Sequence, residues 1–266
     1  MTRLSNIFTW AVAGLAALAA AAGLLGAAYR DVPAMVEQAQ AADLATLFVA
    51  APLLVVALSR RAPIVISATL AYLGYTYAIF SFEIVVNPLA PVYIAILSLS
   101  LWALALRVPE LAAVEVDPAL PRRTAAGFLA LVAVLFGALW LSDIAASIAS
   151  GSLPPSVAAL AVPTSAVYAL DLGFVLPLFL VAAVGLVRHA RHAASLAFGS
   201  LVFLVLMALS ILPMFAFQAV RGDVVDPVAP TIFVVIALVA VGLIAFGAIG
   251  RPLTIRPAVA APGRSV

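Results

Sequence analysis

The sequence predicts an all-α, polytopic membrane protein, a bundle of about eight transmembrane helices. The chain is 67% hydrophobic and only 9% charged, and its mean hydropathy of +1.27 lies far above that of soluble domains. Its apolar segments approach the roughly 20 residues that a helix needs to cross a bilayer. All but two of the 13 arginines flank these segments on one side, which the positive-inside rule assigns to the cytoplasm. Both termini are therefore expected to be cytoplasmic.

The predicted spans are apolar runs separated by short polar or proline-containing connections. Backbone polar groups in lipid must be satisfied within a segment, so runs of this length are helical rather than barrel strands. The first run follows Arg3 and is longer than the apolar region of a signal peptide, so we interpret it as a retained helix. The eight spans are 7–28, 43–58, 63–82, 90–106, 125–141, 168–187, 193–218 and 229–249.

Acidic residues gather on the side opposite the arginines. The outer connections 29–42 and 220–228 carry two acids each, and they also hold the two exceptional arginines, Arg30 and Arg221. The longest outer connection, 143–167, contains three prolines and is expected to form a short helix or turn at the surface. It serves either as a lid over an external site or as an ordinary interfacial loop.

The chain is predicted to form one integral membrane domain made of two halves. The cytoplasmic connection 107–123 separates residues 1–106 from residues 124–250, and residues 251–266 form a cytoplasmic tail.

The two halves share a pattern in their second helices. Asp43 precedes Arg60 by seventeen positions, and Asp171 precedes Arg188 by the same interval. Because both halves begin on the same side, a duplication would be parallel, and proline-interrupted helices at matching positions point to a binding site. A coincidence between two aliphatic helices is the alternative. The prolines are Pro52 and Pro177.

Four carboxylates lie near the outer ends of the predicted helices, namely Asp43, Glu83, Asp143 and Asp171. A charge within the hydrocarbon is costly and marks a functional site by default. For Asp43 we favour a plainer interpretation, because an aspartate at the start of a helix accepts from free N–H groups and complements the helix dipole.

Asp171 is the strongest candidate of the four. If its helix starts at Thr164 or Ser165, the acid lies below the surface. Pro177 cannot donate to the carbonyl of Gly173, so a kink is expected beside the acid. Either the kink borders a site for water, a cation or a ligand, or neighbouring helices satisfy it and Asp171 pairs with a tyrosine or serine.

A polar stripe on the third helix faces these acids. Tyr72, Thr76 and Glu83 share one helical face, and Asn87 and Tyr93 follow in and after the next outer turn. Tyrosines of this kind bind a ligand inside a bundle or form the aromatic belt of a membrane protein.

The same region resembles a family of uncharacterised multi-pass bacterial membrane proteins, over spans two to four and six. The resemblance implies no activity. In that family glycine follows the phenylalanine that matches Phe82, where this chain has Glu83, so Asp171, Asn87 and Tyr93 are the better candidates for a shared site. The residues that carry it are Tyr72, Tyr75, Tyr77, Phe82, Asn87, Leu89, Tyr93, the run SLSL at 98–101 and the run LDLGFVLP at 170–177.

Other chemistry is weakly supported. Without cysteine the chain has no disulfide or thiolate ligand, and without lysine no Schiff base. His189 and His192 stand among Arg188 and Arg191, so lipid phosphate is a better partner for them than a metal. We predict no cofactor, no metal and no nucleic-acid binding, because the arginines serve topology. A lipid-modifying enzyme with Asp171 or Asp143 as base lacks a nucleophile and a metal set.

A stripe of small residues on the first helix, Ala19, Gly23 and Ala27, allows close helix packing, either within the chain or in a homo-oligomer or partner complex. We expect a protein of the plasma or inner membrane that binds or conducts a proton, cation or small solute. Its site would be an outward-facing polar cavity around Asp171 and Glu83. The alternative is a non-enzymatic accessory or assembly subunit of a larger membrane complex.

Overall fold

The computed structural model describes residues 3–26, 28–29, 32–113 and 120–250 of the 266-residue chain. Within this part of the chain, eight helical stretches are long and apolar enough to cross a membrane. The predicted all-α polytopic bundle is thereby confirmed, and the protein is a multi-pass membrane protein whose apolar helices contact the lipid bilayer.

Two of the eight spans contain a π-helical turn. The second span consists of α2 (Pro33–Ala45), η1 (Thr46–Ala50) and α3 (Ala51–Ser59), and the sixth of α8 (Ala166–Leu170), η2 (Asp171–Val175) and α9 (Leu176–Val187). A short helix, α7 (Pro155–Ala159), lies in the longest outer connection, as the sequence predicts. The uninterrupted spans are α1 (Arg3–Leu25), α4 (Pro63–Glu83), α5 (Ala90–Ala113), α6 (Arg122–Ser150), α10 (Ala193–Arg221) and α11 (Val228–Gly250).

The second span begins ten residues earlier than predicted, at Pro33, where proline occupies the first turn of α2 after the extended Val32. Residues 33–42, which were predicted to belong to a polar connection, are helical because the acid among them, Glu37, is neutralised. The buried Glu37 forms an ion pair with Arg221 at the end of α10. This pair explains why Arg221 is an exception to the arginine pattern. Arg30 lies outside the described residues.

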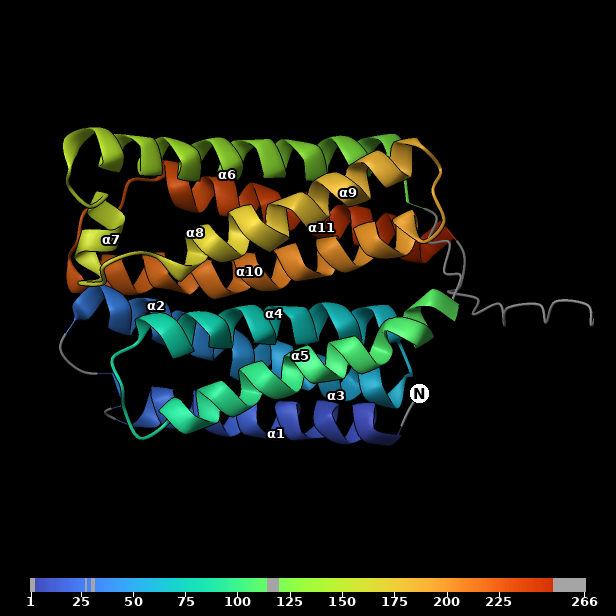
Figure 1. Ribbon diagram of the computed structural model, residues 1–266, viewed down its shortest axis with the longest axis horizontal. Helices are drawn as coiled ribbons and strands as arrows, with labels where there is room; N and C mark the ends of the chain where they lie inside the picture. The colour runs from blue at the N-terminus through green and yellow to red at the C-terminus, as the bar shows by residue number, and fades with distance from the viewer. Residues whose placement is uncertain (1–2, 27, 30–31, 114–119, 251–266) are drawn as a thin grey trace, which may run out of the picture.

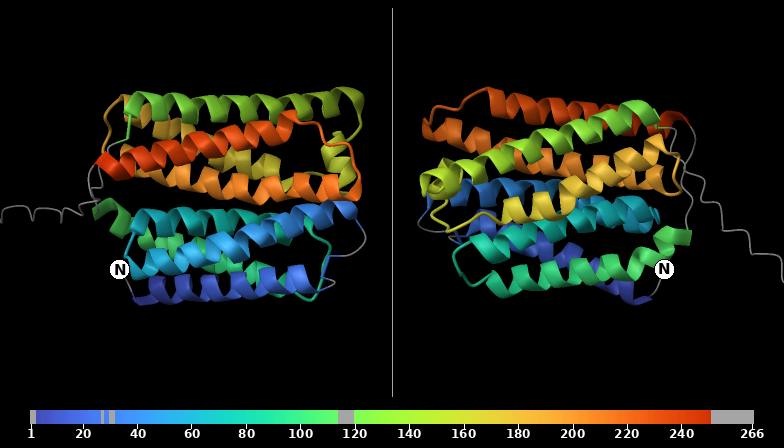
Figure 2. Two further views of the ribbon diagram at one scale, coloured as in Figure 1. Left: turned by 180° about the vertical axis from the view of Figure 1, so that it is seen from behind. Right: turned by 45° about the horizontal axis from the view of Figure 1, so that its top comes forward.

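The helices form two groups, α1 to α5 and α6 to α11, here called the first and second groups (Figure 1). They meet where α10 packs against α2 and α4, and both further views show the same division (Figure 2). One end of the bundle, here the arginine end, holds Arg60, Arg107, Arg122 and Arg188. The other is called the opposite end.

Each π turn ends two residues before a proline, at Pro52 and Pro177. Proline lacks an N–H and its ring crowds the preceding turn, and an extra residue in the turn is one way for a helix to accommodate it. The two spans also end alike, because Arg61 and His189 both have φ of 53° just after the last helical turn. Both spans end at the same distance from their aspartate, but the π turns differ in position. η1 begins three residues after Asp43, whereas η2 begins at Asp171 itself. The repeat stays a prediction.

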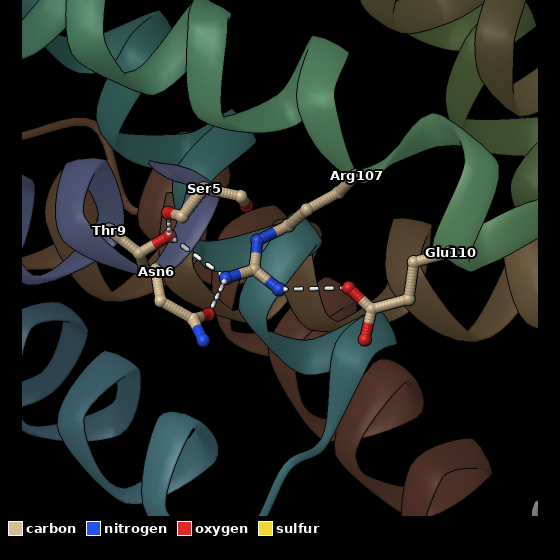
Figure 3. Close-up of polar contacts among 5 residues, drawn as sticks. All are labelled: Ser5, Asn6, Thr9, Arg107 and Glu110. Carbon is tan, nitrogen blue, oxygen red and sulfur yellow. Dashed lines mark hydrogen bonds and ion pairs between the residues drawn. The ribbon is translucent and has the colours of Figure 1, made fainter. Parts of the chain in front are cut away.

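One of the arginines has a structural role that the charge pattern does not predict. Arg107, on α5, is fully buried at the arginine end. Its guanidinium donates to Asn6 Oδ1 and Thr9 Oγ1 of α1, both at 3.0 Å, and contacts Glu110 Oε2 at 3.3 Å (Figure 3). Arg107 therefore ties α5 to α1 through charge-assisted hydrogen bonds.

Candidate functional site

A cavity of about 330 Å³ lies within the second group and reaches α2 and α4 of the first. In the first group α1 packs along α5. In the second group α6 contacts α11 through the rings of Phe136 and Phe233, whose centroids lie 5.8 Å apart. Residues of α7 line the cavity near the opposite end. Its walls are mainly aromatic and aliphatic, and of the described lining residues only Asp171 carries a formal charge. The lining rings are those of Tyr75, Phe80, Phe136, Trp140, Tyr168, Phe179, Phe203, Phe215 and Phe233.

Asp171 is held at the cavity wall by two neutral donors. The Tyr75 hydroxyl of α4 donates to Oδ1 at 2.9 Å, and Trp140 Nε1 of α6 donates to Oδ2 at 2.8 Å. The backbone carbonyl of Asp171 accepts from Leu176 N–H across the π turn. Three spans thus converge on one carboxylate. It lies five residues into the sixth span, whose helix starts at Ala166 after the capping residue Ser165, earlier than the predicted span start at 168 and next to the alternative start considered at Thr164 or Ser165.

Aromatic contacts fix the two donors. Trp140 packs between Phe136 and Tyr168, with ring centroids 6.1 and 5.3 Å away, and Tyr75 meets the edge of Phe203 at 5.7 Å. Trp140 does not stand out in the sequence, because a tryptophan near the end of a span looks the same as a member of the aromatic belt. Asp143 does not line the cavity; it accepts from the Tyr168 hydroxyl at 3.2 Å.

Glu83 lies outside this cavity. Its Oε1 accepts from Ser165 Oγ at 3.0 Å and from the backbone N–H of Ala166, at the first turn of α8. A carboxylate at this position satisfies free N–H groups and complements the positive end of the helix. Glu83 therefore positions the segment that carries Asp171, and the predicted pairing of these two acids in one cavity is not the arrangement that the described residues form.

Tyr72 and Thr76 belong to a buried hydroxyl cluster beside the cavity. Tyr72 is fully buried and its hydroxyl faces Thr46, Thr76 and Ser210. Thr76 and Ser210 also line the cavity. Among the described residues, the Tyr72 hydroxyl and Thr46 Oγ1 have no hydrogen-bond partner. Buried hydroxyls without partners are uncommon, and these two leave hydrogen-bonding groups available at the edge of the cavity.

Asp43 is not a helix cap. It lies ten residues into the second span with an exposed fraction of 1%, so the expectation of capping or interfacial exposure is wrong. The reason is the early start of α2 at Pro33. The Tyr29 hydroxyl donates to Asp43 Oδ2 at 2.6 Å, and the Tyr93 hydroxyl lies 3.5 Å from that of Tyr29. Burial raises the pKa of Tyr29, and the negative charge of the Asp43 carboxylate raises it further. The Tyr29 hydroxyl therefore stays protonated and acts as a donor.

The remaining candidates of the first group lie near this pair. Tyr93 is buried against the rings of Tyr77 and Phe80. Asn87 is half-buried, and its Oδ1 accepts from Leu89 N–H at 2.8 Å, which stabilises the turn. Neither residue lines the Asp171 cavity.

The predicted small-residue stripe packs within the chain at two of its positions. Ala19 and Gly23 are buried, and Gly23 lies against the Asp43 carboxylate and the Tyr29 ring. Ala27 lies outside the described residues.

Replacing Gly23 with alanine is expected to disrupt the Asp43–Tyr29 contact. A Cβ at this position would lie 2.5 Å from the Tyr29 hydroxyl and closer still to Asp43 Oδ2. We expect Gly23→Ala to lower the free energy of unfolding by about 2 kcal/mol, as overpacking does. Unfolding in mixed micelles measures it. Gly14→Ala on the same helix is the control, because its Cβ would meet nothing within 4 Å, and equal effects of both substitutions would contradict the geometry.

The basic residues predicted to bind lipid head groups lie together at the arginine end. Arg188, His189 and Arg191 are exposed, and His192 precedes α10 with φ of 64°. Arg122 Nη1 lies 3.4 Å from His189 Nδ1. Among the described residues no group of three or more His, Cys, Asp or Glu side chains is arranged to hold a metal. Lipid binding stays a prediction.

The chain matches no family model, no curated protein and no solved structure. The family resemblance noted from the sequence therefore stays a prediction.

Proposed function

We propose that the protein is a transporter that binds a small organic cation in the cavity at Asp171. The observation that carries the proposal is a carboxylate that faces an aromatic cavity and receives hydrogen bonds from neutral donors, Tyr75 and Trp140. No ion pair among the described residues includes Asp171. A carboxylate removed from water needs a compensating charge, and a bound cation supplies it.

The size and lining of the cavity narrow the class of ligand. A volume of about 330 Å³ is at the lower end for small-molecule sites, which favours a compact ligand. Aromatic faces such as those of Trp140, Phe136 and Tyr168 attract an ammonium group through cation–π interactions. Calcium and magnesium are poorer candidates, because they prefer six or more oxygen ligands. A substituted ammonium ion with an apolar body fits both the single acid and the rings.

Cation binding at Asp171 would also affect how the two groups of helices are arranged. Among the described residues, the polar contacts that join the two groups of helices include Tyr75 to Asp171, Glu83 to Ser165 and the Ala166 N–H, and Glu37 to Arg221. A cation that competes with Tyr75 for the Asp171 carboxylate would weaken one of them. The ligand would then favour a different arrangement of the two groups, as alternating access requires.

A single-tryptophan protein tests the proposal directly. The chain has three tryptophans, and Trp10 and Trp102 are exposed on the helix surface, so Trp10→Phe with Trp102→Phe leaves Trp140 as the reporter. We expect saturable quenching of its fluorescence by the aromatic cation N-methylpyridinium. Benzyltrimethylammonium should relieve the quenching by competition, and its neutral carbon isostere neopentylbenzene should not.

Two outcomes would contradict the proposal. Quenching that rises linearly with N-methylpyridinium would indicate collisions without a binding site. Equal competition by the cation and its neutral isostere would show an apolar cavity in which the Asp171 charge selects nothing.

A further inference from the structure

A second buried acid lies away from the cavity at Asp171. Asp43, in the first group, is 1% exposed and does not line that cavity, although its neighbour Ala42 does. A carboxylate ten residues into a membrane span is costly unless a proton or a cation neutralises it. The proposed solute site does not use this residue.

The surroundings of Asp43 provide hydroxyls and no counter-ion among the described residues. Tyr29 donates to it at 2.6 Å, and the other titratable side chains that face it are Tyr72, Tyr77 and Tyr93. From α1 it meets Gly23, which carries no side chain. The ionic groups of α2 and α10, Glu37 and Arg221, are paired with each other. A proton is the positive charge that fits so small a space.

A route to water exists at the opposite end of the bundle. A groove of about 470 Å³ is lined by Tyr29, Met35 and Asn87, among others. Tyr29 therefore borders the groove while its hydroxyl is bonded to Asp43. A tyrosine that stays protonated can pass a proton inward from its O–H and take one from water on its other side.

We propose that Asp43 is a proton-binding site, separate from the cavity at Asp171, that exchanges protons with water in the groove through the hydroxyl of Tyr29. In the uptake step, the Tyr29 O–H proton moves to Asp43 Oδ2 and a hydronium ion in the groove returns a proton to Tyr29. The net change is one proton transferred from water to the Asp43 carboxylate, and Tyr29 is unchanged.

The site is also placed to influence the solute cavity. Thr46 follows Asp43 by nearly one helical turn, and the hydroxyls of Tyr72, Thr76 and Ser210 continue from Thr46 to the cavity wall. Protonation of Asp43 would remove a negative charge beside this cluster, which would couple proton binding to solute binding. This coupling rests on the proposed function, whereas the proton site does not.

Infrared difference spectroscopy of the full-length protein, with isotope-labelled aspartate, tests the proton site without any solute. We expect the carbonyl stretch of a protonated aspartic acid that shifts in heavy water and titrates with pH. Asp43→Asn should abolish this contribution. Asp171→Asn and the exposed Asp223→Asn should retain it, so failure of the solute proposal would leave this result intact.

Tyr29→Phe tests the route and covers the case in which Asp43→Asn does not fold. Phenylalanine keeps the ring but removes the relay, so we expect the Asp43 signal to persist while its exchange with heavy water slows several-fold. An aspartic acid signal that is the same in Asp43→Asn as in the parent protein would overturn the proton site. Unchanged exchange in Tyr29→Phe would overturn the relay.

Discussion

Asp171→Asn is expected to weaken binding of N-methylpyridinium by roughly a hundred-fold, because losing one partner of a buried charge pair costs about 3 kcal/mol. The substitution removes the negative charge and keeps the shape of the side chain. An asparagine oxygen can accept from Trp140 Nε1, which only donates, and its amide can donate to the Tyr75 hydroxyl, which also accepts. The fold should therefore persist while cation binding fails.

The measurement is saturable quenching of Trp140 in the single-tryptophan protein, with the free energy of unfolding as a check on folding. Asp223→Asn removes the same formal charge from an exposed position and serves as the matched control. A folded Asp171→Asn protein that binds the cation as tightly as the parent would be inconsistent with a charge-selective site.

Arg107→Met is expected to lower the free energy of unfolding by about 3 kcal/mol, since hydrogen bonds of a buried charged group each contribute more than neutral ones. Methionine fills much of the volume of the arginine side chain but donates to none of its partners. Asn6 and Thr9 of α1 then lose a shared donor, and Glu110 loses its cation. Separation of α1 from α5 at the arginine end should accompany the loss.

Unfolding in mixed micelles measures this effect, and hydrogen exchange in the first turns of α1 localises it. Arg123→Met is the control, because Arg123 is exposed at the start of α6 on the same end of the bundle. Both substitutions remove one positive charge from the predicted cytoplasmic side. Equal losses of stability would mean that the charge itself matters and that the contacts to α1 do not.

The second span shows where sequence reasoning about the fold failed. Residues 33–42 look like a connection because they are less apolar and contain Glu37. They are helical in the structure because Glu37 meets Arg221, which is far away in the chain. A pattern read within one segment contains no information about a partner in another segment. The misplaced start also led to the wrong interpretation of Asp43 as a cap.

The candidate site shows a similar division. Asp171 and the proline-associated irregularity were predictable, and a helix start at Ser165 was one of the alternatives, because each depends on residues within one turn or two of each other. Trp140 and the role of Glu83 were not, because each acts on a different span. The resemblance to a family pattern favoured Asp171, Asn87 and Tyr93, and the last two lie in the first group beside Tyr29.

The sequence by itself determined the class of protein, the number of spans and the predicted orientation, because hydropathy and arginine placement are properties of single segments that lipid and water act on directly. Only the tertiary structure decided which buried acids share a site. Asp171 faces an aromatic cavity, Glu83 secures the start of α8, and Asp43 lies against Tyr29. These outcomes depend on how the spans pack, and the cost of an unpaired polar group in lipid selects the packing in which each acid finds a partner.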